Sequence, residues 1–236
     1  MSEPKNYVIL GGTSGIGEAL VKLLAQEGHQ VFVYARNIRN VQVSSQIHFN
    51  EADVSQEFSL AGLPEVIHGL AYCPGSITLQ PFHRIKTEQF QSDFQLNVMG
   101  AISAIQQCLS GLKASGSAAV VLFSTVAVQT GMSFHTSVAV SKGAVEGLTR
   151  ALAAEYASSR IRINCIAPSL TETPLAEKLL NTIEKKEAGA KRHPLGRIGQ
   201  AEDSARVAQF LLNENEGWIT GQILGVDGGM GSLRLI

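Results

Sequence analysis

The sequence predicts an α/β fold, a doubly wound parallel sheet of about seven strands with helices on both faces. Short apolar runs, which suit strands buried on both faces, alternate with longer segments in which apolar residues recur at helical spacing. No proline-, glycine- or serine-rich linker and no internal repeat divides the chain, so we expect residues 1–236 to form one domain. In such a sheet, ligands bind at the carboxyl ends of the strands.

The first strand and helix, over residues 7–28, carry the strongest sign of a ligand site. The apolar run 7–10 leads directly into GGTSGIG at 11–17, and helical spacing then continues to Gly28. A strand, a glycine turn and a helix in that order surround one point with backbone N–H groups, which attract phosphate. The glycines allow a pyrophosphate to approach the main chain. We therefore expect a nucleotide to contact Gly11, Thr13, Ser14, Gly15, Ile16 and Gly17.

The second strand, expected at 30–35, ends in a basic residue. Arg36 follows it, Arg39 is close behind, and no acidic residue lies between Tyr34 and Asn40. An acid at this tip would bond a ribose 2′-hydroxyl, whereas an arginine suits a 2′-phosphate. The pattern favours NADP(H) over NAD(H), the alternative being that Arg36 is a solvated surface residue.

The turns that follow the third and fourth predicted strands hold further candidate ligand-binding residues. A third strand at 47–50 leads to Asp53 and Val54, where the carboxylate could bond an adenine edge or cap a following helix. The segment 55–64 is short for a crossover helix. A fourth strand at 66–71 leads to Cys73-Pro74-Gly75, where the glycine could bring backbone close to a ligand. Cys73 could face the same pocket or be a small buried residue.

A long helix is expected over 87–112, with Thr87 as its N-cap. Asn97 falls on its apolar face, where an amide must find partners or cost stability. It could satisfy backbone groups, or hold a water and an active-site side chain. The rest of the chain continues the alternation, with strands at 118–123, 161–166 and 223–226 and helices at 137–158, 178–191 and 202–212.

Composition excludes several classes of function. The chain has 236 residues, 17% of them charged, and a net charge of −1, so it lacks the basic footprint of a nucleic-acid-binding protein. No apolar run is long enough to cross a membrane. The three cysteines and six histidines show no metal-ligand spacing. We expect a cytoplasmic, metal-free, soluble protein.

These motifs, taken together, resemble the short-chain dehydrogenase/reductase family over essentially the whole chain, especially members similar to 3-oxoacyl-carrier-protein reductase. The resemblance rests on GGTSGIG, Asp53-Val54, LNVMG around Asn97, SKGAVEGLTRALAAEY and HPLGRIGQAEDSARVAQFLL. It implies a Rossmann-type fold, a homodimer or homotetramer, and an adenine contact at Asp53-Val54. It also implies that Lys142 bonds the nicotinamide ribose, and that the loop carrying Pro168, Thr171 and Thr173 lies beside the nicotinamide.

The resemblance does not extend to the residues that carry out catalysis in the family. The family places a tyrosine four residues before the lysine and a serine thirteen residues before that tyrosine. Lys142 is present, but the other two positions hold Val138 and Thr125, and no tyrosine lies between Tyr72 and Tyr156. A valine side chain can neither donate nor accept a proton. Ser169 also replaces the usual glycine after Pro168.

Two functions remain open on this evidence. The first is an atypical NADP(H)-dependent oxidoreductase acting on a small-molecule carbonyl or alcohol, with Asn97, Thr125 and Lys142 in the site and with a replacement acid or water as the proton source. His135 is then the candidate replacement acid, its alternative role being that of a surface loop histidine. The second is a non-catalytic NADP(H)-binding protein of the same fold, acting as a sensor, partner subunit or scaffold.

Overall fold

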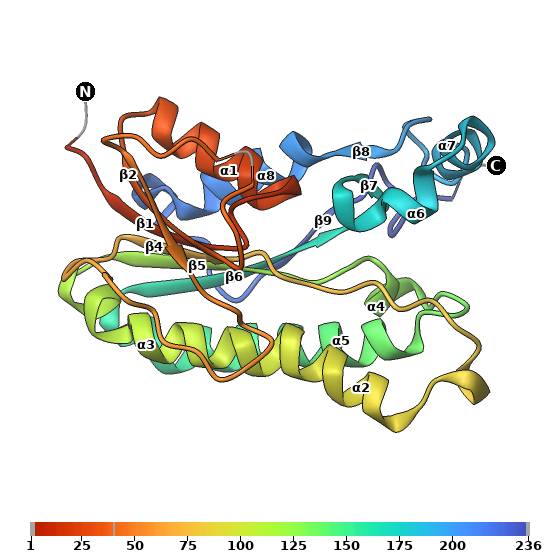
Figure 1. The fold of residues 1–236 in the computed structure, drawn as a ribbon, viewed down its shortest axis with the longest axis horizontal. Coiled ribbons are helices and arrows are strands. Elements are labelled where there is room, and N and C mark those ends of the chain that lie inside the picture. The colour runs from red at the N-terminus through yellow and green to blue at the C-terminus, as the bar shows by residue number, and fades with distance from the viewer. Residues whose placement is uncertain (1–2, 40, 235–236) are drawn as a thin grey trace.

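Seven parallel strands form the central sheet of the computed structural model, which describes residues 3–39 and 41–234. Their order across the sheet is β3-β2-β1-β4-β5-β6-β9, and helices cover both faces (Figure 1). The predicted fold class is confirmed. The strands are β1 (Asn6–Leu10), β2 (Gln30–Ala35), β3 (Ile47–Glu51), β4 (Gly69–Tyr72), β5 (Ala118–Phe123), β6 (Ile161–Pro168) and β9 (Ile223–Val226).

Each face of the sheet has its own helical layer and its own apolar core. Helices α1 (Gly15–Gln26) and α8 (Ala201–Leu212) pack on one face, and α3 (Gly100–Ala114) and α5 (Thr136–Tyr156) pack on the other (Figure 1). Successive strand residues point to opposite faces. In β5, therefore, Val120 and Leu122 join the α3–α5 core, while Val121 joins the α1–α8 core.

The strand order reverses at the middle of the sheet. The chain proceeds outward from β1 to β2 and β3, then returns to place β4 on the other side of β1. Loops leaving β1 and β4 therefore diverge to opposite sides and leave a crevice at their carboxyl ends, which is where open α/β sheets bind ligands.

The long helix predicted for 87–112 is interrupted. It consists of α2 (Thr87–Phe94), a π-helical turn (Gln95–Met99) and α3. Its N-cap is Lys86, so the prediction of Thr87 as the cap was wrong. The π-turn carries Asn97, and such turns are frequent at functional sites because they displace a side chain from the regular helical face.

Several short elements lie outside the predicted pattern. The charged segment 178–191 divides into α6 (Glu177–Leu180) and α7 (Ile183–Ala190), because the Thr182 side chain caps a new helix by accepting a hydrogen bond from the Lys185 N–H. No helix lies between β3 and β4, as the short segment there predicted. The other short elements are β7 (Thr171–Glu172) and β8 (Gly199–Gln200), which pair with each other, helix α4 (Ala127–Thr130), and 3₁₀ turns at Phe82–Arg84, Ala157–Ser159, Pro174–Ala176 and Glu214–Glu216.

Within the described ranges, no helix combines the length and the apolar character needed to cross a membrane.

A substitution at the start of α3 tests how tightly the π-turn is held. A Cβ on Gly100 would lie 2.2 Å from the Tyr72 hydroxyl oxygen and 2.9 Å from the Val54 carbonyl oxygen. The Tyr72 hydroxyl itself donates to the Leu96 carbonyl at 2.6 Å. We expect Gly100→Ala to lower the free energy of unfolding by about 1–3 kcal/mol, measured by urea denaturation.

The matched control is Gly217→Ala. Gly217 has a φ of −61°, and a Cβ there would make only an ordinary contact, 3.6 Å from the Glu214 carbonyl oxygen. Its stability should stay within about 1 kcal/mol of wild type. Equal stability of the Gly100 and Gly217 variants would contradict the close packing beneath the π-turn.

Candidate functional site

A cleft runs along the carboxyl edge of the sheet, among the loops that leave β1, β4, β5 and β6. It comprises a first cavity of about 500 Å³ and a second cavity of about 460 Å³. Both volumes are in the range of ligand pockets, and a single elongated ligand could extend through both because they share lining residues. The shared residues are Ile16, Cys73, Gly75, Thr173 and Leu175.

The glycine loop after β1 forms one wall of the first cavity. Gly11 has a φ of +71°, a conformation that a side chain would strain. A Cβ on Gly17 would lie 2.4 Å from the Gly11 carbonyl oxygen, so only glycine allows α1 to start this close to the turn. The predicted nucleotide-binding residues that line this cavity are Gly11, Thr13, Ser14, Gly15, Ile16, Gly17, Arg36, Asp53, Val54, Cys73, Gly75 and Thr173.

Opposite charges meet at the far end of the first cavity. Asp53 accepts hydrogen bonds from the Ser55 hydroxyl at 2.7 Å and the Ser55 N–H at 3.0 Å. These bonds, with a smaller contribution from Arg36, lower the pKa of the Asp53 carboxyl. Asp53 orders a turn, because no helix follows it for the carboxylate to cap. Arg36 is exposed at the tip of β2, facing the same cavity.

The second cavity collects the predicted residues of the second half of the chain. They come from the ends of β5 and β6 and from the first turns of α5, so the parallel sheet brings them together from distant positions in the sequence. They are Thr125, His135, Lys142, Pro168 and Thr171.

Lys142 is a buried cation at the base of this cavity. Its Nζ donates to the Phe123 carbonyl at 2.8 Å, which ties α5 to the end of β5. Desolvation lowers the pKa of the ammonium to about 8. Burial raises the pKa of the neighbouring Cys73 thiol to about 12, with Lys142 opposing the shift, so Cys73 lacks the environment of a reactive thiolate.

Asn97 lies just behind the cavity wall. Of its two side-chain amide atoms, only the nitrogen has hydrogen-bond partners among the described residues. Its Nδ2 donates to the Asp93 carbonyl at 2.7 Å and to the Ser76 hydroxyl at 3.0 Å. Its Oδ1 is buried and has no partner among the described residues. A Cβ on Gly75 would lie 3.4 Å from both this oxygen and the Lys142 Nζ. The two polar atoms therefore flank one small space beside Gly75, which suits a water or a polar ligand atom.

Val138 lies one helical turn before Lys142 on α5 and lines the second cavity. Its side chain presents only methyl groups to that cavity. Thr125 presents a hydroxyl there, whose oxygen also accepts from the Ala127 N–H at 3.3 Å. His135 is half-buried at the N-cap of α5, and its Nδ1 lies 2.7 Å from the Ser133 carbonyl oxygen. Because a carbonyl only accepts, Nδ1 carries the proton and Nε2 is left free.

A buried carboxylate behind the cavity was missed by the sequence analysis. Asp93 accepts from the Ser137 hydroxyl at 2.6 Å and from the Ser76 hydroxyl at 2.7 Å. It thereby ties α2 to the start of α5 and to the loop after β4. Its position one turn before Asn97, on the same helical face, is the sequence signal that could have found it.

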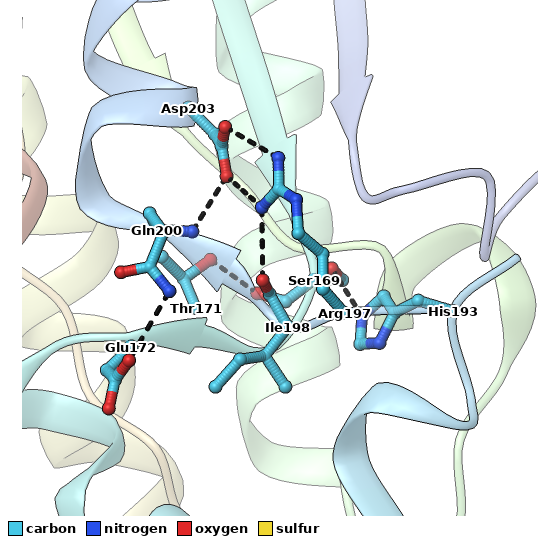
Figure 2. Close-up of polar contacts among 8 residues, drawn as sticks. All are labelled: Ser169, Thr171, Glu172, His193, Arg197, Ile198, Gln200 and Asp203. Atoms are coloured by element: carbon cyan, nitrogen blue, oxygen red, sulfur yellow. Dashed lines mark hydrogen bonds and ion pairs between the residues drawn. The ribbon is translucent and has the colours of Figure 1, made fainter. Parts of the chain in front are cut away.

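A second missed feature is a serine–histidine contact inside the cavity. Ser169 Oγ lies 2.8 Å from His193 Nε2, and both residues line the second cavity (Figure 2). His193 is almost fully buried, with Nδ1 2.8 Å from the Gly189 carbonyl oxygen. In the sequence, Ser169 stands out only because the family resemblance predicts a glycine at that position. Nothing in the sequence indicates that His193 lies next to Ser169.

Comparison with known proteins identifies the family. Residues 11–231 match the family described as enoyl-(acyl carrier protein) reductase. A tropinone reductase homologue of Arabidopsis thaliana is 33% identical, covering 95% of this chain and 92% of that protein. The chain belongs to the short-chain dehydrogenase/reductase family. A 3-oxoacyl-[acyl-carrier-protein] reductase of Thermotoga maritima is 30% identical, covering 97% and 98% respectively.

A solved structure with a similar fold extends the comparison to a bound cofactor. ElxO with NADP bound has a TM-score of 0.86 and 25% identity, covering 98% of this chain and 100% of that one. Short-chain dehydrogenases/reductases bind a nicotinamide cofactor. The cleft described above fits such a group, because it combines a glycine cradle that a Cβ would fill with a buried amide oxygen that has no hydrogen-bond partner within residues 3–39 and 41–234. Across residues 3–39 and 41–234, no cluster of three or more His, Cys, Asp or Glu side chains could hold a metal ion.

The buried ammonium of Lys142 predicts a specific pH dependence. The folded protein releases this proton near pH 8, whereas the unfolded chain keeps it until about pH 10.5. The unfolded state therefore binds more protons between these values, and the contribution of Lys142 to stability rises with pH across the window. We expect the stability difference between wild type and Lys142→Met to shift by about 2–3 kcal/mol in favour of wild type from pH 8 to pH 10.5.

The measurement is urea unfolding of both proteins at several pH values. Comparing them at each pH cancels the opposing effect of buried tyrosines and cysteines, which titrate in both. A stability difference that does not change with pH would contradict a depressed lysine pKa.

Proposed function

We propose that this chain is an NADP(H)-dependent oxidoreductase that interconverts a carbonyl and an alcohol, using a proton donor other than tyrosine. The observation that carries the proposal is the meeting of Lys142 Nζ and Asn97 Oδ1 beside Gly75, where the two cavities join. A buried cation and an open amide oxygen at this junction are groups that bind and orient a polar ligand. They have no evident purpose in a protein that only needs a packed core.

The first cavity supports NADP(H) as the cofactor. Arg36 and Arg39 line it at the tip of β2, where a 2′-phosphate would lie, and they are the charge type that a phosphate requires. Residues 11–17 would hold the pyrophosphate and Asp53-Val54 the adenine. When bound, NADPH supplies a hydride.

The second cavity supplies the remaining groups. Lys142 would bond the nicotinamide ribose, and Pro168, Thr171 and Thr173 would border the nicotinamide ring. Thr125 would orient the substrate oxygen through its hydroxyl. Asn97 would hold a water against Lys142 through its free Oδ1. Each of these groups binds or orients, and none of them requires a tyrosine.

The proton donor is the altered part of this site. Val138 takes the tyrosine position and cannot transfer a proton. His135 is the replacement that the sequence indicates, and it lines the second cavity with a free Nε2. A positioned acid contributes about 10²- to 10⁴-fold to such a reaction, so an enzyme without any replacement would be correspondingly slow.

We further propose a single domain in the cytoplasm that assembles as a homodimer or homotetramer. Large apolar side chains are exposed on the helices of one face, among them Phe94, Met99 and Val140. Pairing of these helices between copies would cover them.

Cofactor choice can be tested at Arg36. Replacing it by aspartate removes a charged hydrogen-bond donor from the 2′-phosphate and supplies the acceptor that a 2′-hydroxyl prefers. We expect Arg36→Asp to weaken NADPH binding about 10- to 100-fold, while NADH binding stays equal or improves, as measured by fluorescence titration. Equal losses for both cofactors would contradict the assignment.

The function itself is tested by single-turnover oxidation of NADPH against a panel of aldehydes and ketones. We expect wild type to turn over at least one of them, and Lys142→Met to lower that rate on the order of 10²-fold. Val138→Tyr, which restores the family's residue, is the companion variant.

The outcomes separate the two functions. NADPH binding without turnover in wild type, with turnover gained in Val138→Tyr, would favour the non-catalytic alternative. Absence of NADPH binding would contradict both.

A further inference from the structure

Ser169 and His193 form an isolated polar pair in the wall of the second cavity. Ser169 follows β6 directly, and His193 follows α7, so two separate segments bring them together (Figure 2). Their side chains meet at 2.8 Å, and both face the cavity that holds Thr125, Val138 and Lys142. The roles proposed above use neither residue.

The hydrogen bonds around His193 fix which of its nitrogens carries the permanent proton. The Gly189 carbonyl can only accept, so Nδ1 donates to it. Nε2 then accepts the Ser169 hydroxyl proton when the ring is neutral, and donates to Ser169 Oγ when the ring is protonated. In the protonated state, the Ser169 hydroxyl hydrogen is free to point toward a third group in the cavity.

Backbone pairing places Ser169 beside the other reactive positions. The Val126 N–H donates to the Pro168 carbonyl at 2.9 Å. Thr125 precedes the donor and Ser169 follows the acceptor, so the two hydroxyl residues flank this one hydrogen bond at the ends of β5 and β6. Lys142 bonds the Phe123 carbonyl near the same strand end.

The segment that carries His193 is firmly anchored. Arg197 donates to both carboxylate oxygens of Asp203, at 2.6 and 2.9 Å, and to the Ile198 carbonyl at 3.1 Å (Figure 2). The Gln200 N–H donates to the same carboxylate at 2.7 Å. These bonds hold the chain after His193 to the start of α8, which keeps the histidine in place without a contribution from substrate.

We propose that Ser169 donates the proton to the substrate oxygen and that His193 supplies it. The proposal rests on the reductase function above and deepens it. NADPH, when bound, would supply the hydride by breaking one of its C–H bonds and would be left as NADP⁺. The carbonyl carbon would gain that C–H bond, the C=O π electrons would move to the oxygen, and the oxygen would take the proton of Ser169 Oγ. Ser169 regains a proton from His193 Nε2, which leaves a neutral imidazole. A proton from bulk solvent, relayed by water in the cavity, protonates His193 again, so one hydride and one solvent proton are added to the substrate in total.

His135 is the rival donor. It lines the same cavity, but no side chain contacts its ring among the described hydrogen bonds, and its Nδ1 is bonded to its own loop. The Ser169–His193 pair has the order that proton transfer requires: a donor hydroxyl, a titratable ring in contact with it, and an acceptor that fixes the ring.

The first test measures the hydrogen bond between Ser169 and His193 in the protein without ligands. We expect ¹⁵N NMR of histidine to show one His193 ring nitrogen protonated, as Nδ1, and the other shifted by its hydrogen bond to Ser169. Ser169→Ala should move the Nε2 resonance, and Ser45→Ala, at an exposed serine outside both cavities, should not. A protonated Nε2 with a bare Nδ1, or no response to Ser169→Ala, would overturn the pair.

The second test measures the proton step. We expect Ser169→Ala and His193→Gln each to lower kcat about 10²- to 10⁴-fold, with KM and NADPH affinity changed only a few-fold. Ser169→Thr, which keeps the hydroxyl, should retain most of the rate. The control is His83→Gln, at an exposed histidine that lines neither cavity, which should match wild type.

Two outcomes would overturn the proton route while the reductase function stands. One is an unchanged kcat in Ser169→Ala, and the other is a loss confined to His135→Gln. If wild type oxidises no NADPH with any carbonyl, the function itself fails. The two failures are therefore distinguishable.

Discussion

The parallel direction of all seven strands is the constraint on which the site depends. Because every strand ends at the same edge of the sheet, the residues that follow β1, β4, β5 and β6 are delivered to one cleft. Gly11, Cys73, Thr125 and Ser169 each follow one of these strands closely. Helix α5 contributes Lys142, whose Nζ donates to the Phe123 carbonyl at the end of β5.

The two halves of the cleft differ in how closely they follow the family's pattern. The first cavity keeps its glycine turn, its acidic turn residue and its arginine at the tip of β2. On the sequence resemblance, the second keeps Lys142 and Asn97, whereas Val138 and Ser169 stand where the resemblance predicts a tyrosine and a glycine. Hydroxyl groups also surround a buried carboxylate behind it, since Asp93 accepts from Ser76 and Ser137. If the resemblance and the proposed function hold, the departures lie around the proton donor and not around the proposed dinucleotide site.

Sequence reasoning predicted the fold class, the seven strands and the residues of the glycine turn, because those features depend on local patterns of spacing. It could not predict the π-turn at Asn97, where the Tyr72 hydroxyl donates to the Leu96 carbonyl and packs against Gly100. It also missed the pairing of Ser169 with His193. These two residues are separated by α6 and α7, and the segment returns through contacts between distant parts of the chain, among them the pairing of β7 with β8 and the anchor at Asp203. Contacts made by such returning segments leave no periodic signal in the sequence.

A crystal structure with NADPH bound would test the central claim most directly. The account predicts one dinucleotide lying through both cavities, with its 2′-phosphate at Arg36, its pyrophosphate at residues 11–17 and its nicotinamide ribose at Lys142. In that complex Ser169 would face the open side of the nicotinamide ring. A dinucleotide bound elsewhere, or one whose nicotinamide lies outside the cavity lined by Lys142 and Ser169, would contradict it.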